Sequence, residues 1–167
     1  MFHTRSCKRL SIIAVLIALL AFPASASTVS FLLVETGISE GGVNGQHSRL
    51  WESGLMSVFF DSGFIVTSSP ITQMQTRSAM DLSGEIGETF NEAINGGADY
   101  FIVGIIEYNV YGGRVAAQRV SVQIYDSNSR QLIYEQSFPA GTGRNENEEF
   151  ALAKSAGRLI ISHIRGR

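Results

Sequence analysis

The pattern of apolar and polar residues divides the first half of the chain into short apolar runs and amphipathic segments separated by glycines. Residues 29–36 (VSFLLVET) form an apolar run rich in β-forming residues, which predicts a buried strand. Ser48 is a suitable N-cap for a helix that extends to about Ser62, because apolar side chains recur there every three or four positions. Residues 64–67 predict a brief second strand. A second apolar stripe predicts a helix from about Asp81 to the stop at Gly96–Gly97, after a polar bridge at 71–80.

The second half of the chain predicts an antiparallel meander followed by a helix. Three strands are expected at residues 100–111, 114–126 and 131–138, with turns at Gly112–Gly113 and at 127–130. Apolar and polar residues alternate in the middle strand, so one of its faces should be buried and the other wet. The last helix is expected from about Glu148 to Ile164, and its inward-facing residues are Phe150, Ala153, Leu159, Ile160 and Ile164.

The order of these elements is β-α-β-α-β-β-β-α. A β-α-β-α-β start favours parallel strands joined by right-handed crossovers, and the meander adds antiparallel strands. The sequence therefore predicts an α+β domain with an α/β-like start, built on a single mixed sheet of about five strands with the helices packed on it. Residues 27–167 have the size of one globular domain.

The first 26 residues have the pattern of a secretory signal peptide. A basic start containing Arg5, Lys8 and Arg9 precedes an uninterrupted apolar run of eleven residues at 12–22, and Ala24-Ser25-Ala26 forms an A-x-A cleavage site. Cleavage between Ala26 and Ser27 is therefore expected. The alternative, a retained anchor, is disfavoured because crossing a membrane takes roughly 20 apolar residues. We expect an exported protein that works in a bacterial periplasm.

Removal of this leader changes the composition in two ways. Three of the 13 Lys and Arg residues leave with it while all 15 acidic residues stay, so the formal charge goes from −2 to −5. Without a basic run, neither nucleic acid nor an anionic membrane surface is an expected partner. Cys7, the single cysteine, also leaves, and Ala24–Ser27 occupy the place where a lipoprotein has its acylated cysteine. No lipid anchor is therefore expected.

Part of the second half resembles a known group of proteins. Three segments carry the resemblance. They are Gly97-Ala98-Asp99-Tyr100, then Ile102-Val103-Gly104, and then a hairpin that reads VSVQIYD at 120–126 and LIY at 132–134. This resembles bacterial envelope proteins of the group formed by the curli-secretion lipoprotein, the penicillin-binding-protein activator lipoprotein and the TolB amino-terminal domain. The resemblance implies a non-enzymatic envelope accessory domain that binds another protein or assembly, in cell-wall synthase activation, secretion, or a flagellar or transport complex.

Candidate residues for small-molecule chemistry are few, and they lie in or directly after the glycine-rich loop at 37–47. His47 and Arg49 could make this loop a periplasmic site that binds, or weakly hydrolyses, a small molecule or envelope polymer. The competing interpretation is a solvated histidine beside a flexible loop. GGxxG at 41–45 lacks the spacing of a phosphate-binding loop, and no metal-ligand spacing occurs. We expect no cofactor and no catalytic residues.

Tyrosines provide the better candidates for partner binding. Tyr108, Tyr111, Tyr125 and Tyr134 all fall in the meander, and tyrosine suits protein interfaces because it combines a large ring with a polar tip. The alternative is that they form cross-strand pairs that cover the sheet. A third interpretation is a homo-oligomer assembled through sheet edges.

Overall fold

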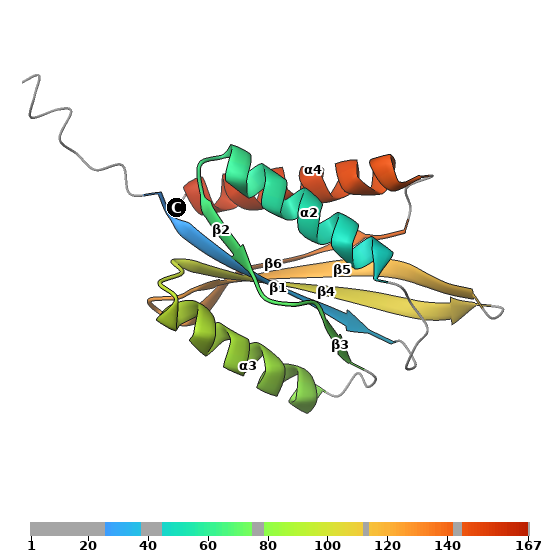
Figure 1. Cartoon of the computed structure of the whole chain (residues 1–167), viewed down its shortest axis with the longest axis horizontal. Coiled ribbons are helices and arrows are strands. Elements are labelled where there is room, and N and C mark those ends of the chain that lie inside the picture. Colours follow the sequence, from blue (N-terminus) through green and yellow to red (C-terminus); the bar gives the residue numbers. More distant parts are fainter. Residues whose placement is uncertain (1–25, 38–44, 75–78, 112–113, 142–144, 167) are drawn as a thin grey trace, which may run out of the picture.

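The computed structural model describes residues 26–37, 45–74, 79–111, 114–141 and 145–166. One mixed sheet of six strands forms its centre (Figure 1). The strands are β1 (Thr28–Thr36), β2 (Ile65–Ser68), β3 (Thr72–Met74), β4 (Tyr100–Tyr111), β5 (Arg114–Asp126) and β6 (Gln131–Pro139). Their order is β2-β1-β4-β5-β6, and β3 pairs with the second half of β1, beside β2. Strand β1 is parallel to β2, β3 and β4, whereas β4, β5 and β6 are antiparallel to one another.

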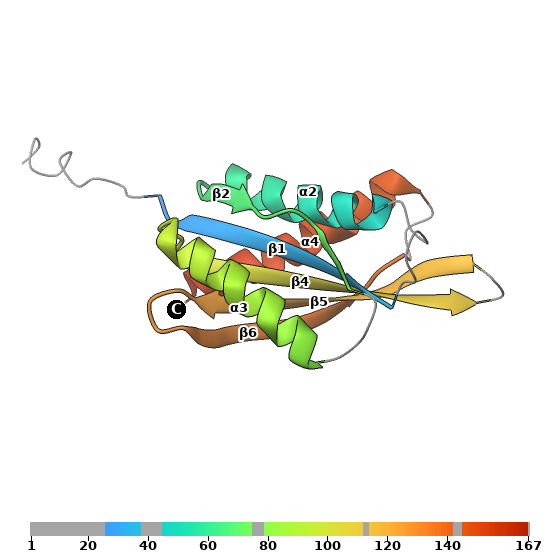
Figure 2. The same cartoon turned by 60° about the horizontal axis from the view of Figure 1, so that its bottom comes forward.

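Three helices cover the two faces of this sheet. Helices α2 (Gln46–Asp61) and α4 (Glu146–Arg165) lie side by side on one face, and α3 (Ala79–Asn95) lies on the other (Figures 1 and 2). The core between the sheet and the α2–α4 pair contains Trp51, Phe31 and Ile124, all fully buried. A smaller cluster lies under α3, where the Phe90 ring stacks on Phe101 at a centroid distance of 5.1 Å. Because β1 and β4 are covered on both faces, their sequences are nearly continuous apolar runs.

Helices α2 and α4 run parallel and approach closely. Their first residues are joined by a hydrogen bond from Gln46 to Glu146, and near their last residues Arg165 donates to the Ser62 carbonyl. A Cβ placed on Gly54 of α2 would lie 2.6 Å from the Cβ of Ala153, so the absence of a side chain permits this contact. A Cβ on Gly157 of α4 would lie 3.4 Å from the Cβ of Val58, which is close to ordinary van der Waals contact.

The structure confirms the predicted class, an α+β fold with one mixed sheet and helices packed on it. The sheet has six strands rather than about five, because Thr72–Met74 of the expected polar bridge pairs with β1 as β3. Three residues are too few for a pattern of alternation, so only the pairing partner reveals this strand. The predicted turn at Gly112–Gly113 lies outside the described residues.

Two further predictions about helices were wrong. Helix α2 begins at Gln46 and its N-cap is Gly45, at φ 65°, whereas Ser48 is buried inside the first turn and donates a hydrogen bond to Glu35. Leu159 of α4 does not face inward, since 53% of its surface is exposed. The wet face expected for the meander is present: Arg119 pairs with Glu107, and Ser121 with Ser137, on the face that carries α3.

Candidate functional site

A buried carboxyl group lies where β1 ends. Glu35 is fully buried, and it accepts hydrogen bonds from Ser48 in the first turn of α2 and from Gln73 of β3, the latter at 2.8 Å. The Tyr108 hydroxyl of β4 lies 3.4 Å from the same carboxyl group and 3.2 Å from the Ser48 hydroxyl. The amino-terminal end of α2 carries partial positive charge, which favours an acidic group at this place. The carboxyl ends of three parallel strands thus meet around Glu35.

Tyr108 lies between two buried acids, and its environment changes its acidity. Burial raises the pKa of Tyr108 to about 12, since the charged phenolate loses its hydration. The hydrogen bond with Ser48 acts in the opposite direction, whereas the charges of Glu35 and Glu149 add to the increase. Tyr108 is therefore a neutral hydrogen-bonding group, and 1% of its surface is exposed.

The second acid, Glu149, lies in the first turn of α4 and is 2% exposed. Its side chain accepts a hydrogen bond of 2.7 Å from the Trp51 indole and one of 2.9 Å from the Gly141 backbone amide. These bonds join α2, α4 and the chain segment that leaves β6. Hydrogen bonds to charged groups are worth about 1.5–3 kcal/mol each, so Glu149 has a complete structural role.

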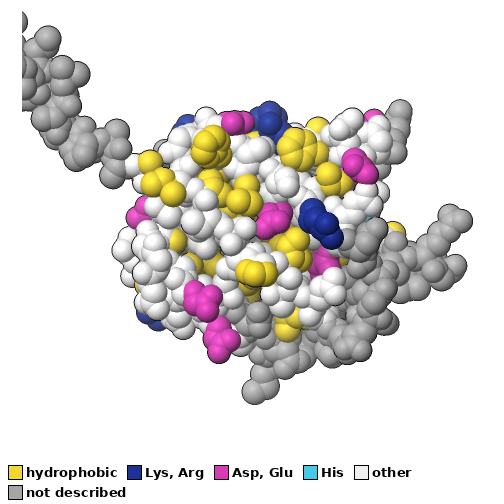
Figure 3. Space-filling view, viewed as in Figure 1, with side chains coloured by type: hydrophobic (Ala, Val, Ile, Leu, Met, Phe, Trp, Pro, Cys, Tyr) yellow, Lys and Arg dark blue, Asp and Glu magenta, His cyan; other side chains and the backbone are white. Residues whose placement is uncertain are grey.

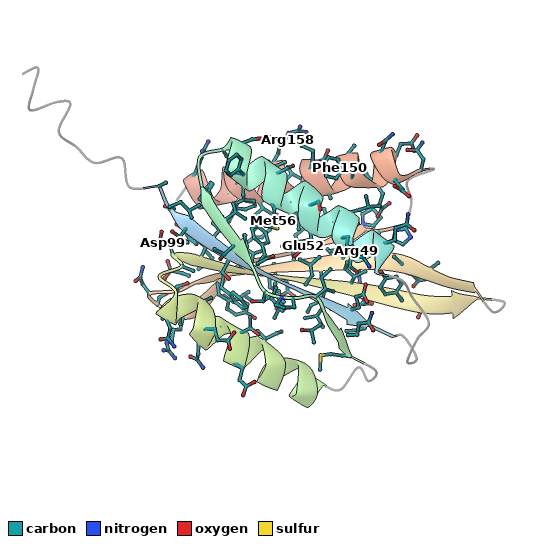
Figure 4. The ribbon with its side chains drawn as sticks, viewed as in Figure 1. Arg49, Glu52, Met56, Asp99, Phe150 and Arg158 are labelled. Carbon is teal, nitrogen blue, oxygen red and sulfur yellow. The ribbon has the colours of Figure 1, made fainter. Side chains whose placement is uncertain are left out.

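The two residues of the loop hypothesis, His47 and Arg49, lie in the first turn of α2, next to the Glu35 cluster. The His47 ring lies 6.5 Å from the Tyr108 ring, and its Nδ1 is buried without a hydrogen-bond partner among the described residues. Arg49 is exposed on the outer side of α2 (Figure 4). A nucleophilic serine must be reachable by its substrate, but Ser48 is fully buried and bonds directly to Glu35. Most of the glycine-rich segment, residues 38–44, lies outside the described residues.

The structure separates three of the four tyrosines, Tyr108, Tyr125 and Tyr134, instead of bringing them together. Tyr108 belongs to the core under α2 and α4, whereas Tyr125 lies on the opposite face, against Phe90 and Phe101. Tyr134 of β6 is half-buried on the α4 side, with its ring 4.6 Å from that of His163. Burial raises the pKa of both Tyr125 and Tyr134. The side chain of Tyr111 lies outside the described residues.

Of these positions, Tyr134 lies at an open edge of the sheet. Strand β6 is the last strand in the sheet order, so one side of its backbone has no neighbouring strand among the described residues. Helix α4 follows β6 after a short connection and runs back along it, which places His163 over Tyr134. Leu159 is one helical turn before His163 on the same stripe of α4 and therefore lies beside β6. We call β6 together with Leu159, His163 and Tyr134 the β6 edge.

Other exposed apolar side chains do not form a comparable surface. On the face seen in Figure 3, hydrophobic side chains are scattered among polar and charged ones. Phe60 near the end of α2 is 72% exposed, and Ile65 of β2 is 53% exposed on an edge of two short strands. Figure 4 shows Glu52 and Met56 along α2, and Phe150 and Arg158 along α4. The β6 edge is different because it combines exposed apolar surface with unpaired backbone.

The described residues contain neither a helix long and apolar enough to cross a membrane nor a group of three or more His, Cys, Asp or Glu residues that could hold a metal ion. Glu146 and Glu148 lie in the first turn of α4, where Asn145 caps the backbone amide of Glu148 at 3.0 Å. The sequence pattern did not predict that Ser48, Gln73 and Tyr108 converge on Glu35, nor that Glu149 is buried. The signal for Glu35 was a single acid inside an otherwise apolar strand.

The sequence model of a protein family described as "Uncharacterised protein" matches residues 39–138, and the chain belongs to this family. No curated protein sequence matches the chain.

Solved structures with a similar fold include three from bacterial proteins. The PelC dodecamer from Paraburkholderia phytofirmans is 11% identical, with 80% of this chain and 87% of that chain covered and a TM-score of 0.48. TolB from Acinetobacter baumannii is 17% identical over 86% of this chain and 28% of TolB, with a TM-score of 0.40. The LpoB C-terminal domain from Salmonella enterica is 15% identical, with 77% of this chain and 93% of that chain covered and a TM-score of 0.41. Members of the group that the sequence resembles are therefore among the matches, and these similarities concern the fold alone.

Proposed function

We propose that the protein is an exported, non-enzymatic accessory protein of the bacterial envelope that works by binding another protein through the β6 edge. The observation that carries this proposal is the open edge of the nine-residue strand β6, over which His163 of α4 lies, with Leu159 53% exposed one helical turn before His163. An open strand edge presents unpaired backbone groups on which another chain can pair. The leader pattern supports export, and the resemblance to envelope accessory proteins supports a role in cell-wall synthase activation, secretion, or a flagellar or transport complex.

This proposal assigns different roles to three of the four candidate tyrosines. Tyr134 contributes its half-buried ring to the binding surface. Tyr108 instead stabilises the core from which β5 and β6 extend, because its hydroxyl is enclosed by Ser48 and Glu35. The Tyr125 ring packs under α3 on the other face of the sheet, against Phe90, and does not belong to the proposed binding surface.

Site-specific photocrosslinking in cells tests the proposal. A photoreactive phenylalanine derivative replaces Leu159 in the full-length chain, and in a matched control it replaces Glu92, which is exposed on α3 at the opposite face. We expect one discrete adduct with an envelope protein from position 159 and none from position 92. Absence of an adduct at 159, or the same adducts at both positions, contradicts protein binding through this edge.

A second candidate function has one observation in its favour. The buried Nδ1 of His47 lacks a hydrogen-bond partner among the described residues, and the neighbouring first turn of α2 presents Arg49. In this candidate, a small molecule or envelope polymer with an acidic group binds at the first turn of α2, where Arg49 is exposed and His47 is half-buried. Replacing His47 and Arg49 by alanine should then abolish ligand binding or hydrolysis without changing the melting temperature, and an unchanged activity would remove this candidate.

A further inference from the structure

We propose that the partner binds by adding an extended segment to β6 as a seventh strand of the sheet, and that this segment alternates apolar with basic residues. The inference rests on the proposed function and specifies the partner's chemistry. Addition of a strand to an open sheet edge gives affinity through main-chain hydrogen bonds and specificity through alternate side chains. Both requirements can be read from β6 and its neighbours.

The backbone of β6 presents its free groups at defined residues. The Ala140 amide, just after the strand, donates to the Gln118 carbonyl at 3.0 Å. Hydrogen-bonded and non-hydrogen-bonded pairs alternate along an antiparallel ladder. In the observed register, residues 134, 136 and 138 therefore bond to β5, and the amides of Glu135 and Ser137 point away from it. Pro139, which has no amide hydrogen, falls on the outward side and limits the edge to the residues before it.

The side chains of β6 offer two different environments to an added strand. On the α4 side, Tyr134 and Phe138 are half-buried against the core, and Leu159 of α4 remains exposed beside them. On the other side, Glu135 and Ser137 are exposed, and the Glu135 carboxylate accepts a hydrogen bond of 3.0 Å from Gln123. A segment with apolar residues toward α4 and a lysine or arginine opposite Glu135 would match both sides.

Charge favours such a partner over a second copy of this chain. Antiparallel pairing of two β6 strands would set outward residues against outward residues, so Glu135 would face Glu135 or Ser137 of the other copy. The two Glu135 carboxylates would then be opposite or diagonal neighbours, within about 8 Å of each other, and like charges at this spacing are destabilising. The other edge of the sheet, made of β2 and β3, offers runs of only four and three residues. A basic segment that pairs with β6 avoids both the repulsion between like charges and the short strands of the other edge.

Two variants at one position test the mechanism. Ser137→Pro removes an outward amide without removing a bond to β5, whereas Ser137→Ala keeps that amide and loses only the hydroxyl bonded to Ser121. In the photocrosslinking experiment at position 159, we expect S137P to abolish the adduct and S137A to retain it. An adduct that persists in a folded S137P chain overturns strand addition while leaving protein binding intact. An adduct whose mass is twice that of this chain overturns the basic partner in favour of a second copy. No adduct in the parent chain overturns both proposals.

Amide hydrogen exchange of the purified protein provides a second measurement that does not depend on how well S137P folds. The probes are two nine-residue peptides, one alternating leucine with lysine and the other alternating leucine with glutamate. We expect the lysine peptide to slow exchange at Glu135 and Ser137 by on the order of tenfold or more, and Glu135→Lys to remove the effect. Equal slowing by both peptides, or none at these two amides, contradicts the inference.

Discussion

At the scale of single residues, two buried acids and a buried tyrosine stabilise the fold through their hydrogen bonds. Glu35 and Glu149 each bring an acidic group to the start of a helix, and both raise the pKa of Tyr108 together with its burial. Unpaired buried polar groups are costly, so these residues stabilise the fold only because each has partners. The ends of β1, β4, α2 and α4 are held by this network.

Tyr108 predicts how stability depends on alkaline pH. Because folding raises the pKa of Tyr108 from 10.0 to about 12, the folded chain holds the phenol proton more tightly than the unfolded chain. Its contribution to stability is therefore complete below pH 10 and is lost as the pH rises from 10 through 12. Two pKa units correspond to roughly 2–3 kcal/mol, and we expect an effect of about 2 kcal/mol.

Urea unfolding at pH 9 and at pH 11.5 measures this effect. The loss of unfolding free energy between the two pH values should be about 2 kcal/mol smaller in Tyr108→Phe than in the parent chain. Tyr134→Phe is the control. Tyr134 is only half-buried and contributes less to the pH dependence of the unfolding free energy, so its replacement should leave most of the loss in place. An identical loss in Tyr108→Phe and the parent would show that another group carries the alkaline dependence.

At the scale of elements, the pairing of α2 with α4 places the β6 edge. Helix α4 approaches α2 closely at Gly54, where a Cβ would lie 2.6 Å from the Cβ of Ala153. In this position of α4, helix α2 does not cover Leu159. Small residues at the helix contact thus determine which apolar side chain stays exposed.

Gly54→Ala tests this contact. The added Cβ would lie 2.6 Å from the Cβ of Ala153 and 3.1 Å from the Phe150 carbonyl oxygen, so α2 and α4 must move apart. We expect a loss of about 1–3 kcal/mol of unfolding free energy, measured by urea titration. Gly84→Ala in α3 is the matched control: Gly84 is exposed and its Cβ would meet no described atom within 4 Å, so a gain of up to about 1 kcal/mol is expected.

Adding Ala153→Gly to Gly54→Ala should restore part of the lost stability, because it removes the nearest atom from the contact. If Gly54→Ala is neutral, or if Ala153→Gly does not compensate, the close approach of the two helices does not limit stability.

At the scale of the whole molecule, the chain is attached to the sheet directly after the predicted leader. The Ser27 carbonyl accepts a hydrogen bond of 3.0 Å from the Ile65 amide, and the Thr28 amide donates to the Asp99 carboxylate at 2.8 Å. Cleavage between Ala26 and Ser27 would leave both bonds intact. An exported product with this amino terminus would therefore keep the complete sheet.

Expression with the natural leader in a Gram-negative bacterium tests export and processing together. We expect the protein in the periplasmic fraction, with Ser27 as its first residue by amino-terminal sequencing. Ala26→Glu should accumulate the uncut precursor, because the cleavage site requires a small residue there, whereas Ser25→Ala should be processed normally. Recovery of the parent chain with its leader attached would contradict the export prediction.

The sequence by itself determined most of the secondary structure, because the pattern that specifies a helix or strand lies within a few neighbouring residues. The elements of the β-α-β-α-β-β-β-α order follow from such local periodicity, as does the wet face of β5. Tertiary structure alone decided what depends on distant partners. Thr72–Met74 is a strand because β1 offers it a backbone, and Glu35 can be buried because Ser48, Gln73 and Tyr108 converge on it. Leu159 is exposed because the orientation of α4 is set by its packing against α2 and the sheet, and helical periodicity cannot specify that orientation.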